Sequence, residues 1–227
     1  MKVRDMMGKT KDLILNNDGT CTFVFRDDAC GEDGVFNPGA NKAELKIDGM
    51  GKASMLLSSY FFPILKDAGI PVHYINIDLQ AATMLGQNLT ILPVEYIWRE
   101  KAWGSFCETY GVERGTSLNG LIESTLKSDA LGDPRINKEA LIAIGKITAQ
   151  QYEACEQYTR KAGAILKTEL SKFEYELIDL KLEFGLNTKG EVVLADEISG
   201  GIWRILKNGK PVDPIECAKT ICADYYD

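Results

Sequence analysis

The segment from residue 176 to residue 204 constrains the fold most strongly, because it places charged residues inside an otherwise apolar β pattern. Apolar and charged residues alternate from Ile178 to Phe184, which is typical of a strand with one buried face. The sequence Asn-Thr-Lys-Gly at 187–190 then favours a turn. We therefore predict a β-hairpin whose first strand carries three charged residues on one face: Asp179, Lys181 and Glu183.

The register of this hairpin decides which charged residues meet. A symmetrical turn would pair Leu186 with Glu191. Lys181 would then lie opposite Asp196, and Glu183 would lie one diagonal step from Asp196. Two neighbouring carboxylates on a half-buried sheet repel each other unless one is protonated or a cation lies between them, and Mg²⁺ shared with substrate phosphates prefers such oxygen ligands. The pattern therefore indicates a Mg²⁺-nucleotide site, although a solvent-exposed sheet face with an ordinary Lys-Asp pair fits it as well.

The composition is that of an ordinary globular protein, with 45% hydrophobic and 26% charged residues among 227. The first residues lack the apolar stretch of a signal peptide, and no run approaches the about 20 apolar residues of a membrane helix, so we expect a cytoplasmic protein without membrane contact. A net charge of −7 without a basic stripe argues against nucleic-acid binding. Six cysteines without CxxC spacing and a single histidine disfavour a structural zinc site.

A second hairpin is expected near the N-terminus, because apolar runs at 12–15 and 21–25 flank the turn sequence at 16–19. Lys9 and Lys11 precede the first run and are two positions apart, so they would share a strand face and could reach one polyphosphate. Two solvent-exposed lysines are the alternative. The segment lacks the GxxxxGK[ST] pattern of a P-loop.

Arg99 ends another apolar β segment and is followed by Gly104 and Ser105, which could open a helix. These residues could form an anion pocket, or Arg99 could be a surface arginine beside a turn. The other predicted elements follow from apolar periodicity and turn residues. They are an irregular connection at 27–52, a helix at 54–68, a strand at 72–77, a hinge at 86–88, a strand at 89–99, a charged loop at 127–134, a long amphipathic helix at 148–170 and a short helix at 214–223.

The sequence also resembles a known family, and the resemblance rests on five motifs in order: GKTK, REKAWGS, LKSDALGDP, LIDLKLEFG and VVLADEIS. Together they resemble the SAICAR synthetase family over residues 3–205. The resemblance implies an α+β fold of two lobes, residues 1–87 and 88–227, with antiparallel sheets and ATP in the cleft between the lobes. It implies an ATP-dependent carbon-nitrogen ligase of purine biosynthesis that joins CAIR and L-aspartate to give SAICAR, ADP and phosphate. A homodimer with these small-molecule substrates is expected.

The resemblance implies roles for individual residues. Nucleotide-binding roles fall on Lys9, Lys11, Lys127, Glu183 and Asp196, and the last two would hold Mg²⁺. Substrate-binding roles fall on Asp33, Arg99, Ser105, Asp133, Lys181 and Arg204. Lys181 and Arg204 are also the expected catalytic residues, because positioning and electrostatic stabilisation can promote phosphoryl transfer without a protein nucleophile. No general base for the aspartate amine is identified.

Three departures from the family pattern fall on the substrate side. Gly200-Gly201 replaces a Pro-Asp pair before Arg204, residues 35–58 contain an insertion and an altered loop, and the short ending DPIECAKTICADYYD replaces a basic segment and a long helix. These departures leave open a paralogue that joins a different carboxylate and amine, and more distantly a nucleotide-binding module without activity. If CAIR is the substrate, another residue must replace the missing aspartate. The candidates are Asp129, Asp133 and the inserted loop between 35 and 50.

Overall fold

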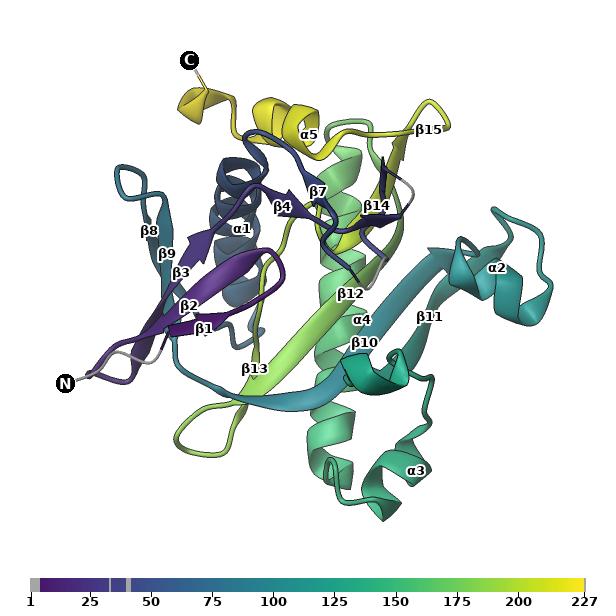
Figure 1. Cartoon of the computed structure of the whole chain (residues 1–227). Helices are drawn as coiled ribbons and strands as arrows, with labels where there is room; N and C mark the ends of the chain where they lie inside the picture. The colour runs from purple at the N-terminus through teal and green to yellow at the C-terminus, as the bar shows by residue number, and fades with distance from the viewer. Residues whose placement is uncertain (1–4, 33, 40–41, 227) are drawn as a thin grey trace. The chain divides into compact units, whose positions relative to one another are not determined.

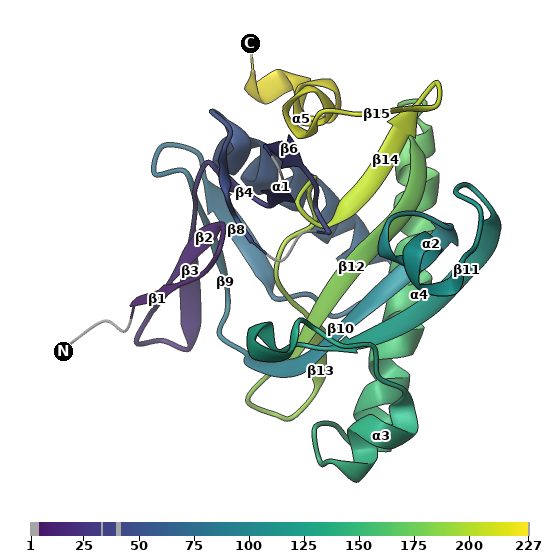
Figure 2. The ribbon, with the colours of Figure 1, turned by 45° about the vertical axis from the view of Figure 1, so that its right-hand side comes forward.

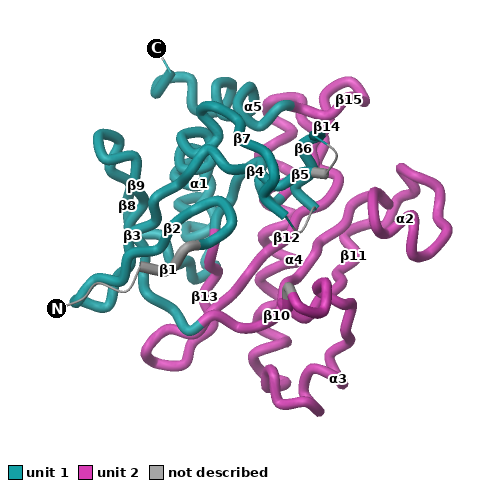
Figure 3. Tube along the Cα trace, in the orientation of Figure 1, with its two compact units in different colours: residues 1–90, 197–202, 213–227 teal, residues 91–196, 203–212 magenta. Residues whose placement is uncertain are grey.

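Two compact units make up the part of the chain that the structure describes. The computed structural model covers residues 5–32, 34–39 and 42–226 (Figure 1). One unit comprises residues 1–90, 197–202 and 213–227, and the other comprises residues 91–196 and 203–212 (Figure 3). The chain therefore passes from one unit to the other after Thr90, Asp196, Ile202 and Val212. The expected division into residues 1–87 and 88–227 stays a prediction.

The first unit is built on a five-stranded sheet with the strand order β1-β2-β3-β9-β8, in which neighbours are antiparallel. The strands are β1 (Asp5–Met7), β2 (Lys11–Leu15), β3 (Thr20–Phe25), β9 (Thr83–Gln87) and β8 (Tyr74–Asp78). The predicted N-terminal hairpin is confirmed as β2 and β3. Two short pairs accompany the sheet: β4 (Asp28–Ala29) with β7 (Leu45–Lys46), and β5 (Gly31–Glu32) with β6 (Val35–Phe36).

Helix α1 (Met50–Asp67) packs against β3 and β8 of this sheet. It begins four residues before the predicted start at residue 54. Gly49 precedes it in a left-handed conformation (φ 85°), and the carboxylate of Asp27 accepts a hydrogen bond from the N–H of Gly51 (2.9 Å). Because this cap comes from a residue 24 positions away, the local sequence does not show it.

The end of the described chain is fixed onto α1. Helix α5 (Pro214–Ile221) packs on α1 and is followed by the 3₁₀ helix η2 (Ala223–Tyr225). Lys52 of α1 donates a hydrogen bond to the carbonyl of Tyr225 (3.0 Å), and its ammonium group lies over the ring of Tyr226, 4.4 Å from the ring centre. Residues 214–226 therefore cover α1.

The second unit contains a sheet with the strand order β11-β10-β12-β14-β15, and β13 also pairs with β12. The strands are β11 (Ser117–Leu126), β10 (Thr90–Lys101), β12 (Glu176–Leu186), β14 (Trp203–Lys207), β15 (Lys210–Pro211) and β13 (Val192–Leu194). Helix α4 (Ala149–Ser171) lies along one face of this sheet, against β11, β12 and β13 (Figures 1 and 2). The short helices are α2 (Ser105–Tyr110), η1 (Asp129–Leu131) and α3 (Lys138–Ala143).

The predicted amphipathic helix is confirmed as α4. A capping box fixes its start, because Thr148 accepts a hydrogen bond from the N–H of Gln151 (3.2 Å) and the Gln151 side chain accepts one from the N–H of Thr148 (2.9 Å). Its Tyr152 packs against Tyr96 of β10, with ring centres 5.3 Å apart. Within the described residues, no helix combines the length and apolar character needed to cross a membrane.

The charged hairpin forms as β12 and β13, but its register is one residue away from the predicted one. Leu186 pairs with Val192 and not with Glu191. The loop is closed by a hydrogen bond from the N–H of Asn187 to the carbonyl of Glu191 (3.1 Å). Gly190 has a φ of 77°, the left-handed conformation that ends a three-residue hairpin loop. The predicted four-residue turn is therefore wrong, since glycine allows a tighter one.

The corrected register changes the partners of the charged residues. Strand β13 ends at Leu194, and the N–H of Ala195 donates a hydrogen bond to the carbonyl of Glu183 (2.9 Å). Asp196 follows outside the strand with a φ of 66°. The predicted pairing of Lys181 with Asp196 across the strands is therefore wrong.

Candidate active site

Lysines and glutamates form a cluster of ion pairs on three neighbouring strands of the second unit. Lys181 and Glu183 lie on β12, Glu95 lies on β10, and Lys127 directly follows β11. Lys127 Nζ is 2.6 Å from Glu183 Oε1, and Lys181 Nζ is 2.7 Å from Glu95 Oε1. The cross-contacts Lys181–Glu183 and Lys127–Glu95 are longer, at 3.8 and 3.7 Å. Each carboxylate thus faces both ammonium groups.

Asp196 adds a further carboxylate to this cluster. Burial raises the pKa of Glu183, and the negative charge of Asp196 raises it further. The pKa of Lys181 is raised as well, which for a lysine favours the charged form. Burial lowers its pKa, but the charges of Glu183 and Glu95 outweigh burial and hold the pKa above its ordinary value. Glu183 and Asp196 therefore interact as two like charges, as the sequence predicted, but through the turn after β13 and not through the predicted register.

Glu95 is expected to make stability depend on pH in the acid range. Burial alone would raise its pKa, but Lys181, Lys127 and the hydroxyl of Thr125 (3.0 Å) together hold the pKa of Glu95 below its ordinary value. In the unfolded chain the pKa of a glutamate is about 4.3, and above this pH the ionised carboxylate of Glu95 stabilises the fold. This contribution is lost as the pH falls through the lower pKa that Glu95 has in the folded protein. Urea unfolding of the wild type and Glu95→Gln should show a difference in stability that shrinks toward low pH. A difference that stays constant with pH would contradict this account.

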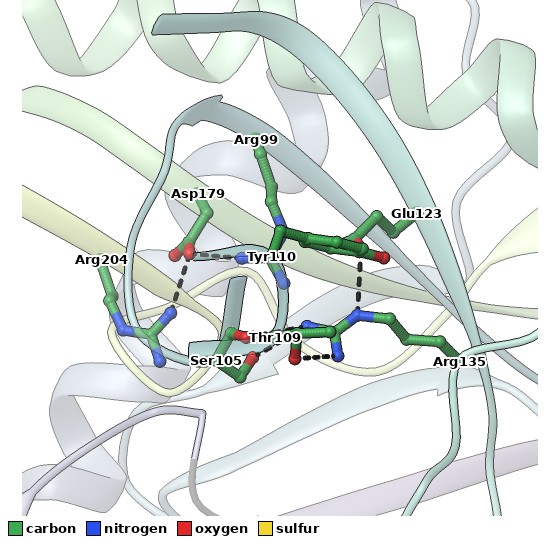
Figure 4. A network of polar contacts seen from close by, with 8 residues as sticks. All are labelled: Arg99, Ser105, Thr109, Tyr110, Glu123, Arg135, Asp179 and Arg204. Carbon is green, nitrogen blue, oxygen red and sulfur yellow. Dashed lines mark hydrogen bonds and ion pairs between the residues drawn. The ribbon is translucent and has the colours of Figure 1, made fainter. Parts of the chain in front are cut away.

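A second network on the same sheet joins arginines through two carboxylates (Figure 4). Arg99 lies at its centre, with Nη1 3.0 Å from Asp179 Oδ2 and Nε 2.5 Å from Glu123 Oε2. Arg204 Nη1 lies 2.8 Å from Asp179 Oδ2, and Arg135 Nε lies 3.0 Å from Glu123 Oε1. Burial raises the pKa of Asp179, while the charges of Arg204 and Arg99 oppose this rise. The two guanidinium groups therefore favour the ionised form of Asp179.

Gly104 and Ser105 at the start of α2 contact the two ends of this network. Arg135 Nη2 donates a hydrogen bond to the carbonyl of Ser105 (3.1 Å) and lies 3.4 Å from Ser105 Oγ. Arg204 Nη2 lies 3.2 Å from the position that a Cβ would take on Gly104, whose φ is 51°. The structure therefore brings Arg99, Arg204 and Ser105 into one network.

In the first unit, Glu197 forms an ion pair with Lys11. Lys11 Nζ lies 2.5 Å from Glu197 Oε1, and Ser199 Oγ donates a hydrogen bond to Glu197 Oε2. Lys9 lies in the turn between β1 and β2, which is closed by a hydrogen bond from the N–H of Gly8 to the carbonyl of Lys11 (3.0 Å). Because β2 begins only at Lys11, the prediction that Lys9 and Lys11 share a strand face is wrong.

Two predicted site residues remain, Asp133 and Asp33, and the structure describes only the first of them. Asp133, with a φ of 48°, accepts a hydrogen bond from the N–H of Ser128 (2.7 Å) and so closes the loop that follows Lys127. Asp33 lies outside the described residues. The sequence motifs indicate no role for five charged residues that make the contacts above: Glu95, Glu123, Arg135, Asp179 and Glu197. Glu95, Glu123 and Asp179 carried the same signal as Lys181, a charge within an apolar strand.

Comparisons with known proteins identify the family of the chain. A model of the SAICAR synthetase family matches residues 5–216. Among curated proteins, the phosphoribosylaminoimidazole-succinocarboxamide synthase of Clostridium tetani is 41% identical over 219 residues, which cover 94% of this chain and 96% of the relative. The protein of that name from Finegoldia magna is 35% identical over 200 residues, covering 87% of this chain and 83% of the relative.

Solved structures that are similar to this chain are also SAICAR synthetases. A SAICAR synthetase in complex with ADP has a TM-score of 0.86 at 29% identity, covering 98% of this chain and 97% of the other. The SAICAR synthetase of Pyrococcus horikoshii OT3 has a TM-score of 0.82 at 28% identity, covering 95% of this chain and 97% of the other. The predicted α+β fold with antiparallel sheets is therefore confirmed. The chain belongs to the SAICAR synthetase family.

Proposed function

We propose that this protein is an ATP-dependent ligase that joins CAIR and L-aspartate to give SAICAR, ADP and phosphate. The observation that carries this proposal is its 41% identity, over nearly the whole of both chains, to an enzyme named phosphoribosylaminoimidazole-succinocarboxamide synthase. The ADP bound to a structural neighbour with a TM-score of 0.86 supports ATP as the phosphoryl donor. These relatives do not favour the alternative of a different carboxylate and amine.

The carboxylates of Glu183 and Asp196 are the proposed ligands of Mg²⁺. Among the described residues, no group of three or more His, Cys, Asp or Glu side chains is arranged to hold a metal ion. The chain would therefore supply two carboxylates, and phosphate oxygens and water would complete the coordination that Mg²⁺ requires. The pKa of Glu183, raised by burial and by Asp196, fits this assignment because a cation between the two carboxylates would relieve their repulsion. Bound Mg²⁺ would neutralise charge on the nucleotide phosphates.

Lys127 is suited to exchange partners when the nucleotide binds. Its side chain is 42% exposed, whereas the Glu183 side chain with which it pairs is only 10% exposed. An ionised carboxylate that is buried is stabilised by a cation beside it, so Lys127 can turn to a phosphate oxygen once the Mg²⁺ charge reaches Glu183. Lys9 and Lys11 are the other proposed contacts of the nucleotide phosphates.

The proposed chemistry requires no protein nucleophile. The carboxylate of CAIR attacks the γ-phosphorus of ATP, and ADP leaves as the acyl phosphate forms. The amine of aspartate then attacks the acyl carbon and releases phosphate and a proton as the amide forms. Lys181 keeps its proton because its pKa is raised, so it can stabilise the negative charge on the reacting carboxylate and phosphoryl oxygens. Arg99, Ser105, Asp133 and Arg204 are the proposed contacts of the phosphoribosyl-imidazole substrate, with Arg204 also fixing its orientation. A homodimer and a cytoplasmic location stay predictions.

Coupled measurement of ADP release tests this function. Release should require ATP, CAIR and aspartate together, and omission of any one should reduce it to background. Mass spectrometry should identify SAICAR as the product. ADP release that proceeds without CAIR, or that requires another carboxylate and amine, would contradict the proposal.

Replacing Gly201 with aspartate is expected to lower activity. A Cβ at Gly201 would lie 3.4 Å from Glu197 Oε2 and 3.5 Å from Ser199 Oγ. An added carboxylate would therefore repel Glu197 and compete with it for Lys11. We expect kcat/KM for CAIR to fall roughly tenfold, the effect of about 1.4 kcal/mol. Gly201→Ala, which adds the same Cβ without charge, is the control and should stay within about threefold of the wild type; higher activity in Gly201→Asp would contradict this expectation.

A further inference from the structure

Arg135 is an arginine of the second network to which neither the sequence nor the proposed reaction gives a role. Its backbone is tied to β11, since residue 135 bridges Thr125, and the flanking Ile136 N–H donates a hydrogen bond to the carbonyl of Ser124 (3.1 Å). Its guanidinium group makes the contacts with Glu123 and Ser105 given above, and Nη1 donates a hydrogen bond to Thr109 Oγ1 (2.7 Å) (Figure 4). The side chain is thus held in one position beside Ser105.

The exposure of the three arginines differs along the network. The side chain of Arg99 is 3% exposed, whereas those of Arg204 and Arg135 are 20% and 31% exposed. A ligand arriving from solvent therefore reaches the two ends of the network before its centre. The two carboxylates that link the arginines, Asp179 and Glu123, are 4% and 10% exposed. Three guanidinium groups and two carboxylates leave one net positive charge, which favours an anionic ligand.

The guanidinium group of Arg135 has more N–H donors than the hydrogen bonds it makes within the described residues. A guanidinium group has five N–H bonds, one on Nε and two on each terminal nitrogen. Among the described residues, Nε is engaged by Glu123, one N–H of Nη1 by Thr109, and Nη2 by Ser105. A second N–H on Nη1 is left for a ligand oxygen. A phosphate group at Ser105 could therefore accept hydrogen bonds from the Ser105 hydroxyl and from Arg135, as guanidinium groups commonly provide.

We propose that Arg135 is a further substrate-binding residue, which acts beside Ser105 to bind the phosphate of the phosphoribosyl substrate. This inference rests on the proposed function. Glu123 is the positioning residue of this arrangement, because its carboxylate links the exposed Arg135 to the buried Arg99. Tyr110 supports the same arrangement, since its hydroxyl lies 3.1 Å from Glu123 Oε1 and its ring centre lies 5.2 Å from the Arg135 guanidinium carbon.

Steady-state kinetics of Arg135→Gln, with CAIR and with the corresponding nucleoside that lacks the phosphate, test the inference. The KM for CAIR should rise about 10- to 100-fold, the range expected for a lost charge-assisted hydrogen bond. The KM for ATP and for aspartate should stay within about twofold. With the nucleoside, wild type and variant should be equally poor, because the group that Arg135 binds is missing. Arg135→Lys, which keeps the charge, should give an intermediate KM for CAIR. Arg160→Gln removes an exposed arginine that pairs with Glu156 on α4 and is the matched control.

Binding of ribose 5-phosphate, followed by NMR against ribose, separates this inference from the proposed reaction. Saturable binding of ribose 5-phosphate to the wild type, weakened in Arg135→Gln, would support the anion site even if the wild type showed no turnover with CAIR. A KM for CAIR unchanged in Arg135→Gln would overturn the inference while leaving the reaction established. Equal losses with CAIR and with the nucleoside would also overturn it, since they would indicate a structural role only. A rise confined to the KM for aspartate would assign Arg135 to the amino-acid carboxylate and not to the phosphate.

Discussion

Replacing Glu183 with glutamine, or Asp196 with asparagine, is expected to lower ATP-dependent turnover at least about 100-fold. Each change removes one of the two carboxylates proposed to hold Mg²⁺, and a loss of about 3 kcal/mol in transition-state stabilisation corresponds to this factor. Asparagine also tolerates the left-handed conformation that Asp196 adopts at a φ of 66°, so the backbone can be retained. The measurement is ADP release with saturating CAIR and aspartate over a range of Mg²⁺ concentrations.

The control for these two variants is Glu191→Gln. Glu191 belongs to the same hairpin, is exposed, and accepts a hydrogen bond from the side chain of Asn187 (2.8 Å). Its turnover and Mg²⁺ dependence should match those of the wild type. Full ATP turnover in both Glu183→Gln and Asp196→Asn would exclude these carboxylates as the metal ligands.

Replacing Asp179 with alanine is expected to lower the free energy of unfolding by about 3–5 kcal/mol. The carboxylate is 4% exposed and pairs with Arg99 and Arg204, so its removal leaves the buried Arg99 charge with Glu123 as its remaining acidic partner in the network. For a chain of this length the melting temperature should fall by roughly 6–20 °C. Urea and thermal unfolding, followed by circular dichroism, measure the change.

Glu176→Ala is the matched control for this prediction. Glu176 lies on the same strand, β12, and also forms an ion pair, with Lys101, but its side chain is 45% exposed. Because exposed ion pairs contribute little, the control should lose less than about 1 kcal/mol. Equal losses in Asp179→Ala and Glu176→Ala would show that burial does not set the contribution of the Asp179 pairs.

The sequence predicted elements whose signals are local. The capping sequence and apolar face of α4, the turn between β2 and β3, and the alternation in β12 depend on residues a few positions apart. The early start of α1 was missed because its cap comes from Asp27. The hairpin register was missed because it depends on the conformation of one residue, Gly190, and both loop lengths fit the turn sequence.

The same distinction applies to the candidate site. The charges on β12 stood out because they interrupt an apolar strand, and the family motifs marked Lys127, Arg99 and Arg204. Their partners lie far away in the sequence: Glu95 is 86 residues from Lys181, and Glu197 is 186 residues from Lys11. The pair of Lys181 and Glu95 follows from the order of the strands β10 and β12, and the pair of Lys11 and Glu197 follows from the path of the loop between β13 and β14. The sequence alone gives neither.

The division of the first unit along the chain has a consequence for its synthesis. Its strands and α1 are complete by residue 90, but the helix that covers α1 begins only at Pro214, and Lys11 meets Glu197 only after 186 further residues. During translation the side of α1 that faces α5 therefore stays exposed until residues 214–221 have left the ribosome. Such long-range closure slows folding and prolongs exposure of apolar surface to aggregation. Nascent chains halted before residue 214 should accordingly bind chaperones more strongly than the released protein.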